Sequence, residues 1–161
     1  MVELRSRIYF SDYSAINEMF IKLGNYHAEL YPEFIKKDCE KRDTKQIIDL
    51  IMDPKTELVV AEEDYELVGF CLATVVEKKE NDQVYGRKYM MINDIFVYPE
   101  HRRKGIGTQF VMYIEGSAKK RKIDTVELNC WAKNESANGF YKKLGYEPML
   151  VRMTKKLTDQ E

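Results

Sequence analysis

The sequence predicts a domain of the α/β (α+β) class, with a mixed, mostly antiparallel central sheet of about seven strands and about four flanking helices. The 161-residue length fits one domain, and 44% apolar with 33% charged residues is typical of a globular protein. Segments with β-type alternation are separated by helical patterns in some places and by short turns in others, so parallel and antiparallel pairs are both expected. We therefore expect a single domain over residues 1–161.

The N-terminal half begins with apolar residues at every second position and then changes to helical spacing, which Pro32 ends. A second, shorter helical pattern follows it. Two β-rich runs then flank the acidic pair Glu63 and Asp64, as in a hairpin. The predicted elements are a strand at 2–10, a helix at 12–30, a helix at 43–52 and strands at 58–62 and 67–76.

The C-terminal half opens with a polar stretch, residues 77–87, which predicts a loop. After it, strands and helices alternate. Gly145 is placed to end the last helix. The predicted elements are strands at 90–97, 124–131 and 149–157, a helix from the glycine-bearing turn to about 121, and a helix at 134–143.

Composition restricts the classes of partner. Twenty-six basic and 27 acidic residues give a formal charge of -1, so we expect neither nucleic acid nor membrane as a partner. No apolar run approaches the ~20 residues of a membrane span, and the N-terminus has a strand pattern rather than that of a signal peptide, which favours a cytoplasmic protein. The cysteines, Cys39, Cys71 and Cys130, are too scattered for a disulfide framework or a metal pair, so no metal site is expected.

The stretch EHRRKGIGTQF, residues 100–110, carries the clearest chemical signal. Gly105 and Gly107 remove side chains from a predicted turn between strand and helix, where free backbone N–H groups and the positive end of the helix dipole attract phosphate. Arg102, Arg103 and Lys104 add positive charge. The turn lacks the Gly-Lys-Ser/Thr of Walker A, and Phe110 replaces the third glycine of GxGxxG, so a different diphosphate ligand is expected.

The order Arg102-x-x-Gly105-x-Gly107 after the strand INDIFVYP resembles motif A of the GCN5-related N-acetyltransferases (GNAT). A second family signature lies downstream. The matching residues are Asn134, Ala137, Phe140, Tyr141, Leu144, Gly145 and Tyr146. The resemblance extends over the order of elements along nearly the whole chain, and it implies an acetyl-CoA-dependent N-acetyltransferase with the GNAT fold.

The resemblance also implies roles for individual residues. The backbone of Ile95, Phe96 and Val97 would pair with the pantetheine arm of acetyl-CoA, and the N–H of Val97 would polarise the thioester carbonyl. Asn134 and Asn138 would contact the same arm. The diphosphate would lie on the turn, near the charges of Arg102 and Lys104 and on the N–H groups of Arg103, Lys104, Gly105, Ile106, Gly107 and Thr108.

Acetyl transfer to an amine needs a base and an acid. Tyr141 matches the usual acid of the family, although it could instead orient the cofactor, and it also counts among the cofactor contacts. Asp94 is the candidate base, with a water chain as the alternative and Glu127 as a weaker substitute. Cys130 shares the apolar face of its predicted strand, so direct transfer in a ternary complex is favoured over a thioester intermediate. His101 is expected to be a surface residue.

The segment NYHAELYPEF, residues 25–34, combines aromatic rings with carboxylates, which suits an organic cation. Tyr26, Glu29 and Tyr31 are therefore the candidate acceptor-binding residues, and the expected acceptor is a small-molecule amine such as a polyamine or an aminoglycoside. Two other functions remain open: a protein or peptide N-acetyltransferase, and a non-catalytic acetyl-CoA-binding module. Exposed strand edges are compatible with a homodimer.

Overall fold

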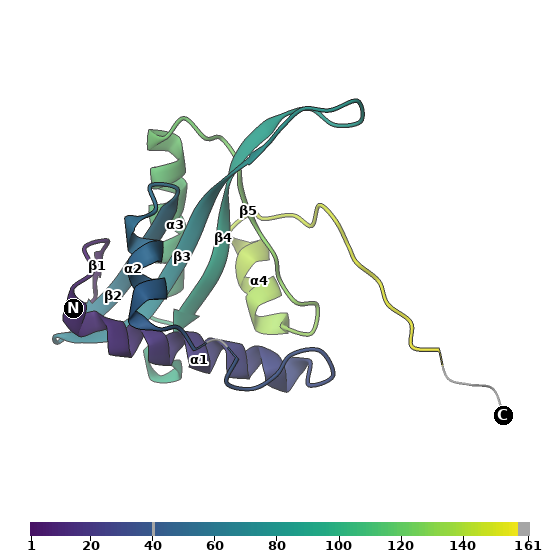
Figure 1. Ribbon diagram of the computed structural model, residues 1–161. Coiled ribbons are helices and arrows are strands. Elements are labelled where there is room, and N and C mark those ends of the chain that lie inside the picture. Colours follow the sequence, from purple (N-terminus) through teal and green to yellow (C-terminus); the bar gives the residue numbers. More distant parts are fainter. Residues whose placement is uncertain (40, 158–161) are drawn as a thin grey trace. The chain divides into compact units, whose positions relative to one another are not determined.

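The computed structural model describes residues 1–39 and 41–157 (Figure 1). The chain forms two compact units. The N-terminal unit, Met1–Asn129, contains the sheet and three of the α-helices, and the C-terminal unit, which begins at Cys130, contains the fourth. None of the described helices is both long and apolar enough to cross a membrane.

The N-terminal unit is built on a five-stranded sheet whose spatial order follows the sequence, β1-β2-β3-β4-β5. The first three pairings are antiparallel, and β4 with β5 is parallel, so the predicted mixed and mostly antiparallel sheet is confirmed. The strands are β1 (Glu3–Arg5), β2 (Thr56–Glu63), β3 (Glu66–Lys78), β4 (Arg87–Val97) and β5 (Val126–Leu128).

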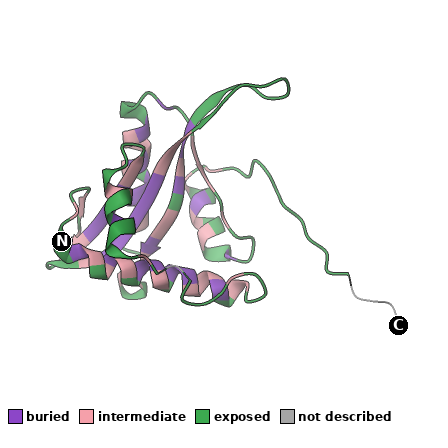
Figure 2. Cartoon of the chain, viewed as in Figure 1, coloured by how far each residue is buried: buried purple, intermediate pink, exposed green. Residues whose placement is uncertain are grey.

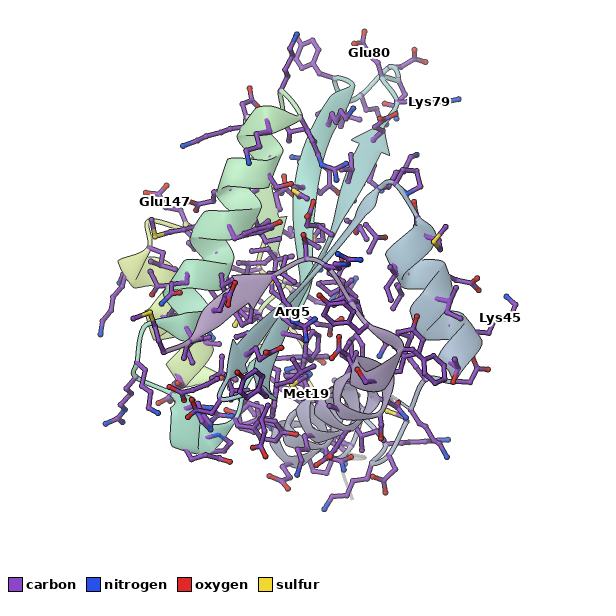
Figure 3. All side chains as sticks on the ribbon, turned by 90° about the vertical axis from the view of Figure 1, so that its left-hand side faces the viewer. Arg5, Met19, Lys45, Lys79, Glu80 and Glu147 are labelled. Carbon is purple, nitrogen blue, oxygen red and sulfur yellow. The ribbon has the colours of Figure 1, made fainter. Side chains whose placement is uncertain are left out.

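Two hairpins connect the antiparallel strands β2, β3 and β4. Asp64 and Tyr65 link β2 to β3 with φ angles of 52° and 69°, the two left-handed residues that tight hairpin turns use. Between β3 and β4 the ladder continues as far as the pair Lys78 and Arg87, which makes the predicted loop shorter than expected. This hairpin projects as an exposed arm, with Lys79 and Glu80 at its tip (Figure 3).

Helices cover both faces of this sheet. Phe70 packs on Phe20 of α1, with 4.4 Å between ring centroids, and a Cβ atom on the adjacent Gly69 would point the other way, 3.3 Å from Phe110 of α3. Figure 3 shows α3 and α2 on opposite sides of the strands. The helices are α1 (Tyr13–Leu30), α2 (Thr44–Met52) and α3 (Ile106–Lys120), with single 3-10 turns η1 (Phe10–Asp12) and η2 (Pro99–His101).

Local sequence signals account for the helix boundaries. Asp43 and Gln46 form a reciprocal capping box at the start of α2, with bonds of 2.8 Å in each direction.

The apolar residues of α1 and α2 meet β2, β3 and β4 in one core cluster, in which Met19 of α1 is fully buried (Figure 3). On the other face, Ile106, Phe110, Val111 and Ile114 of α3 are buried in the way that its periodicity predicts.

An ionic cluster fastens the N-terminal segment to the sheet. The guanidinium group of Arg5 donates to both carboxylate oxygens of Asp12, at 2.9 and 3.0 Å, and to Glu62 of β2. Asp12 is 7% exposed and also accepts the backbone N–H of Tyr9 at 2.7 Å. Burial raises the pKa of Asp12, but the bonds from Arg5 and Tyr9 outweigh it, so the pKa of this carboxyl is lowered.

The C-terminal unit is organised around α4 (Glu135–Lys143). Asn134 caps its first turn by accepting the N–H of Ala137 at 3.2 Å. At the other end Gly145 has a φ of 89°, and the N–H groups of Gly145 and Tyr146 bond back to Lys142 and Tyr141 in a Schellman arrangement. The helix and both of its end signals agree with the prediction.

The expected number of strands was wrong, because the sheet has five rather than about seven. The predicted strand at 149–157 is irregular in the structure, and its apolar side chains are exposed, as the green tail in Figure 2 shows. A strand forms only when another strand completes its hydrogen bonds, and the described part of the C-terminal unit contains no strand. The first and fifth strands are also shorter than predicted, with three residues each.

Candidate functional site

The end of β4 has one edge that faces away from β3. The N–H of Tyr98 donates to the carbonyl of Val68 at 3.0 Å, so Tyr98 directs its backbone groups toward β3. Backbone direction alternates along an antiparallel ladder, and Val97 and Ile95 therefore direct theirs to the opposite edge. Over the described residues β5 pairs with this edge only from Met90 to Ile92. The three residues predicted to bind pantetheine thus lie beyond the end of β5.

Arg102 fixes the turn that follows this strand. Its Nε donates to the carbonyl oxygen of Val97 at 2.9 Å, across five residues. The carbonyl oxygen of Val97 is thereby hydrogen-bonded within the protein. The N–H of Val97 points to the same side of β4, the side away from β3, which we call the open edge. This arrangement suits a ligand that brings an acceptor oxygen to Val97.

The turn itself depends on two left-handed residues. Arg103 has a φ of 61° and Gly105 a φ of 81°, and between them the chain reverses from η2 into α3. Glycine adopts this conformation without strain, whereas arginine does so at a cost. Residues 102–105 are all exposed.

The first turn of α3 is placed to bind an anion. Gly105 is its N-cap residue, and the first helical bond runs from Gln109 to the carbonyl of Gly105 at 3.0 Å. A glycine cap has no side chain with which to satisfy the N–H groups of Ile106, Gly107 and Thr108. These donors lie at the positive end of the helix dipole and are among the N–H groups for which diphosphate binding was predicted.

Asp94 lies on the face of the sheet that α1 and α2 cover. It pairs with Leu72, a member of the α1–α2 core cluster, and directly opposite residues share a face. Asp94 is half-buried. Burial raises the pKa of the buried Cys71 thiol, and the negative charge of Asp94 raises it further. The Asp94 carboxylate is therefore close enough to interact electrostatically with Cys71.

Tyr98 is a residue of this region that the sequence did not single out. Its ring packs on Phe96 at 5.1 Å and lies 5.7 Å from Nζ of Lys22, which comes from α1. Burial raises the pKa of Tyr98, and the negative charge of Glu18 of the same helix raises that pKa further. The end of β4 therefore meets α1 through charged and aromatic groups.

The candidate acceptor residues lie at the C-terminal end of α1. Tyr26 and Glu29 are three positions apart on the helix and so share one side, and Tyr31 is the C-cap residue. Both tyrosines are half-buried and Glu29 is exposed. Two hydrogen bonds between Asn25 and Asp38, of 2.7 and 2.8 Å, hold the following loop against this end of the helix.

The remaining predicted site residues belong to the C-terminal unit. Tyr141 lies in α4 and is 7% exposed, with its ring centroid 5.8 Å from that of Tyr146. Asn134 is the helix cap, and the side-chain amide of Asn138 donates to the carbonyls of Trp131 and Asn134. Both asparagines thus have structural roles, and their predicted contacts with the cofactor remain predictions.

Two other sequence expectations can be compared with the structure. Cys130 lies just outside β5 and is half-buried, and burial raises the pKa of its thiol, which disfavours the thiolate that a covalent intermediate needs. His101 was expected at the surface, but its ring is 24% exposed and Nδ1 lies 2.9 Å from Oε2 of Glu63. Among the described residues, no group of three or more His, Cys, Asp or Glu side chains is placed to hold a metal ion.

Residues 21–146 match the family model described as the acetyltransferase (GNAT) family. The chain belongs to this family. The match contains β4, the turn, α3 and α4. It confirms the family predicted from the sequence.

Part of the chain resembles a curated N-acetyltransferase. An uncharacterized N-acetyltransferase of Methanocaldococcus jannaschii is 40% identical over 76 residues, which are 44% of this chain and 34% of that protein. The chain therefore matches only about a third of the length of this curated relative.

Two solved structures show the same fold. A tetramutant of a Bacillus halodurans protein has a TM-score of 0.86 at 19% identity, with 98% of this chain and 99% of that chain covered. An aminoglycoside N-acetyltransferase in complex with CoA has a TM-score of 0.71 at 13% identity, with coverages of 98% and 95%.

Proposed function

We propose that the protein transfers the acetyl group of acetyl-CoA to a primary amine of a small cationic acceptor, by direct attack in a ternary complex. One observation carries the proposal: the open edge of β4, which ends at Val97, leads within nine residues to the glycine-capped N-terminus of α3. The edge offers backbone groups to the amide-containing pantetheine arm, and the helix offers N–H donors to the diphosphate.

The transfer begins when the amine nitrogen attacks the carbonyl carbon of the thioester. Negative charge develops on the carbonyl oxygen, and the N–H of Val97 stabilises it. Because an ammonium ion has no free electron pair, a base must first remove a proton, and Asp94 takes that role. When the carbon–sulfur bond breaks, the CoA thiolate accepts a proton, for which Tyr141 is the proposed donor. The nitrogen loses its extra proton as the amide forms, and a proton returns to the Tyr141 hydroxyl.

Acidic and aromatic groups support a small cationic acceptor. Asp94 lies on the sheet face that α1 covers, and α1 carries the candidate acceptor residues Tyr26 and Glu29 together with Glu18. Carboxylates and aromatic faces both attract organic cations. The aminoglycoside N-acetyltransferase of similar fold acts on one such class of compound, so aminoglycosides and polyamines are the first acceptors to test.

The test is the release of CoA thiol from acetyl-CoA in the presence of polyamines, aminoglycosides, amino acids or peptides. Turnover with one of the first two classes is expected, and Asp94→Asn should lower kcat with that acceptor. Turnover with peptides alone would identify a protein-modifying enzyme. Tight CoA binding without turnover of any acceptor would indicate a binding module.

The kinetic order needs a separate measurement. Direct transfer predicts intersecting lines in double-reciprocal plots of both substrates and no acetylated protein after incubation with acetyl-CoA alone. Parallel lines together with an added acetyl mass that Cys130→Ser abolishes would establish a thioester intermediate instead.

A further inference from the structure

Glu63 links the β2–β3 hairpin to the turn that precedes α3. It is the last residue of β2, immediately before the tight turn at Asp64 and Tyr65. Its Oε2 lies 2.9 Å from Nδ1 of His101 and 3.6 Å from Nζ of Lys104. The two partners flank Arg102 and Arg103 in the sequence, so one carboxylate contacts both ends of the turn.

The turn needs such an external support. Residues 102–105 are exposed, which means that burial does little to hold them, and the left-handed φ of Arg103 is unfavourable for a residue with a side chain. By contrast, the side chains of Glu63 and His101 are only 22% and 24% exposed, and partial burial protects their interaction from screening by water and salt.

The ionisation of Glu63 is consistent with this contact. Partial burial raises the pKa of Glu63, but the charge of Lys104 and the bond with His101 lower it by more, so the pKa lies below its usual range. The carboxylate is therefore negative at neutral pH and can hold both partners.

We propose that Glu63 is a positioning residue for the diphosphate turn: by holding His101 and Lys104 it keeps the N–H groups of Ile106, Gly107 and Thr108 aimed at one point. This inference rests on the proposed binding of acetyl-CoA at that turn. Glu63 touches no substrate, and because it is itself negative it withdraws part of the charge of Lys104 from the ligand. Its effect on affinity is favourable only if holding the turn outweighs that loss of charge.

Glu63→Ala removes the support, and Glu66→Ala is the matched control. Glu66 pairs directly with Glu63 across the hairpin and is exposed, so both variants lose one carboxylate from the same turn. We expect Glu63→Ala to raise the Kd for CoA and the KM for acetyl-CoA about 5- to 10-fold, with kcat and the KM for the amine unchanged. Glu66→Ala should change none of them.

A truncated donor separates positioning from a general structural effect. Acetyl-pantetheine carries the thioester and the amide arm but no diphosphate, so Glu63→Ala should use it with the same kcat/KM as the unsubstituted protein. Glu63→Gln retains an oxygen acceptor for His101. Its affinity for CoA should lie between those of Glu63→Ala and the unsubstituted protein. It also supplies the result if the alanine variant does not fold.

Each alternative outcome is recognisable. An equal loss with both donors would show that Glu63 only supports the fold, and tighter CoA binding by Glu63→Ala or Glu63→Gln would show that it merely competes for Lys104. Either result overturns the proposal while leaving the acetyltransferase function intact. If the unsubstituted protein itself fails to bind CoA in calorimetry, the proposed function is wrong and the inference is overturned with it.

Discussion

Nε of Arg102 lies 2.9 Å from the carbonyl oxygen of Val97, so this side chain bonds to the backbone of the strand that ends five residues earlier. The resemblance to the GNAT family predicts that Arg102 lies beside the diphosphate as a source of charge. The structure shows that the same residue also closes the turn between β4 and α3. Its contribution to binding should therefore exceed that of a neighbouring cation.

Arg102→Ala is expected to raise the Kd for CoA about 3- to 10-fold, because it removes both a charge and a charged hydrogen-bond donor at an exposed site. Arg103→Ala is the control, since it removes only a charge from the adjacent exposed position. Calorimetry on both variants measures the difference. Equal losses would mean that the bond to Val97 makes no contribution.

Gly107→Val should weaken CoA binding by at least 10-fold, because a branched side chain would lie beside the N–H groups that the diphosphate approaches. Gly116→Val is the matched control in the same helix, where a Cβ atom has no neighbour within 4 Å. Helix propensity does not predict a loss for either substitution, because valine ranks above glycine in a helix. Unchanged CoA affinity in Gly107→Val, measured by calorimetry, would place the diphosphate elsewhere.

Tyr141→Phe keeps the ring that packs on Tyr146 and removes only the hydroxyl. If Tyr141 is the general acid, kcat should fall by ~10²- to 10⁴-fold while CoA affinity stays within a few-fold. Tyr146→Phe, the neighbouring tyrosine in the same unit, should leave kcat nearly unchanged. An unchanged kcat in Tyr141→Phe would assign the proton to water, and a collapse of CoA affinity would make Tyr141 a structural residue.

Gly69→Ala should destabilise the protein by roughly 1–3 kcal/mol, the usual cost of overpacking a filled interior. The added Cβ would lie 2.6 Å from the carbonyl oxygen of Phe96, a backbone atom that cannot move without shifting β4. Gly116→Ala, by contrast, fills open space in a helix and should stabilise by about 0.5–1 kcal/mol. Urea denaturation of the two variants tests the opposite signs.

The lowered pKa of Asp12 should make the free energy of unfolding depend on pH in the acid range. A carboxyl whose folded-state pKa is lowered stabilises the fold above its unfolded pKa, about 3.9, and this stabilisation is lost as the pH falls through the lower folded value. The free energy of unfolding should therefore decrease below about pH 4. Asp12→Asn should be less stable at pH 7 and show a flatter dependence over that acid range.

Asp49→Asn is the control for Asp12→Asn, because Asp49 forms an exposed ion pair with Lys45 in which both side chains are more than half exposed. Such exposed pairs contribute little to stability, because water and salt screen them. Denaturation curves from pH 3 to pH 7 should show little difference between this variant and the unsubstituted protein. If Asp12→Asn behaved in the same way, the cluster around Arg5 would not contribute to acid stability.

The segments that the sequence predicted well are those with strong local signals. The helix predicted at 43–52 is present as α2, Asn134 and Gly145 mark the two ends of α4, and α3 follows the glycine-bearing turn, all as expected. The prediction failed where a segment needs a distant partner. Apolar and polar residues alternate over residues 149–157 as in a strand, but the structure has no strand there. Alternation is a property of one segment, whereas a strand also needs a partner strand for its backbone hydrogen bonds.

The sequence by itself determined the family and the glycine-bearing turn before α3, since both depend on residues a few positions apart whose backbone preferences are local. Only the tertiary structure decided how the turn is held. Glu63 lies 38 residues from His101, and over the described residues β5 pairs with β4 only as far as Ile92, which leaves the edge at Val97 without β5. Such contacts depend on how the sheet brings distant residues together, and side-chain pairing across the fold leaves no periodic trace in the sequence.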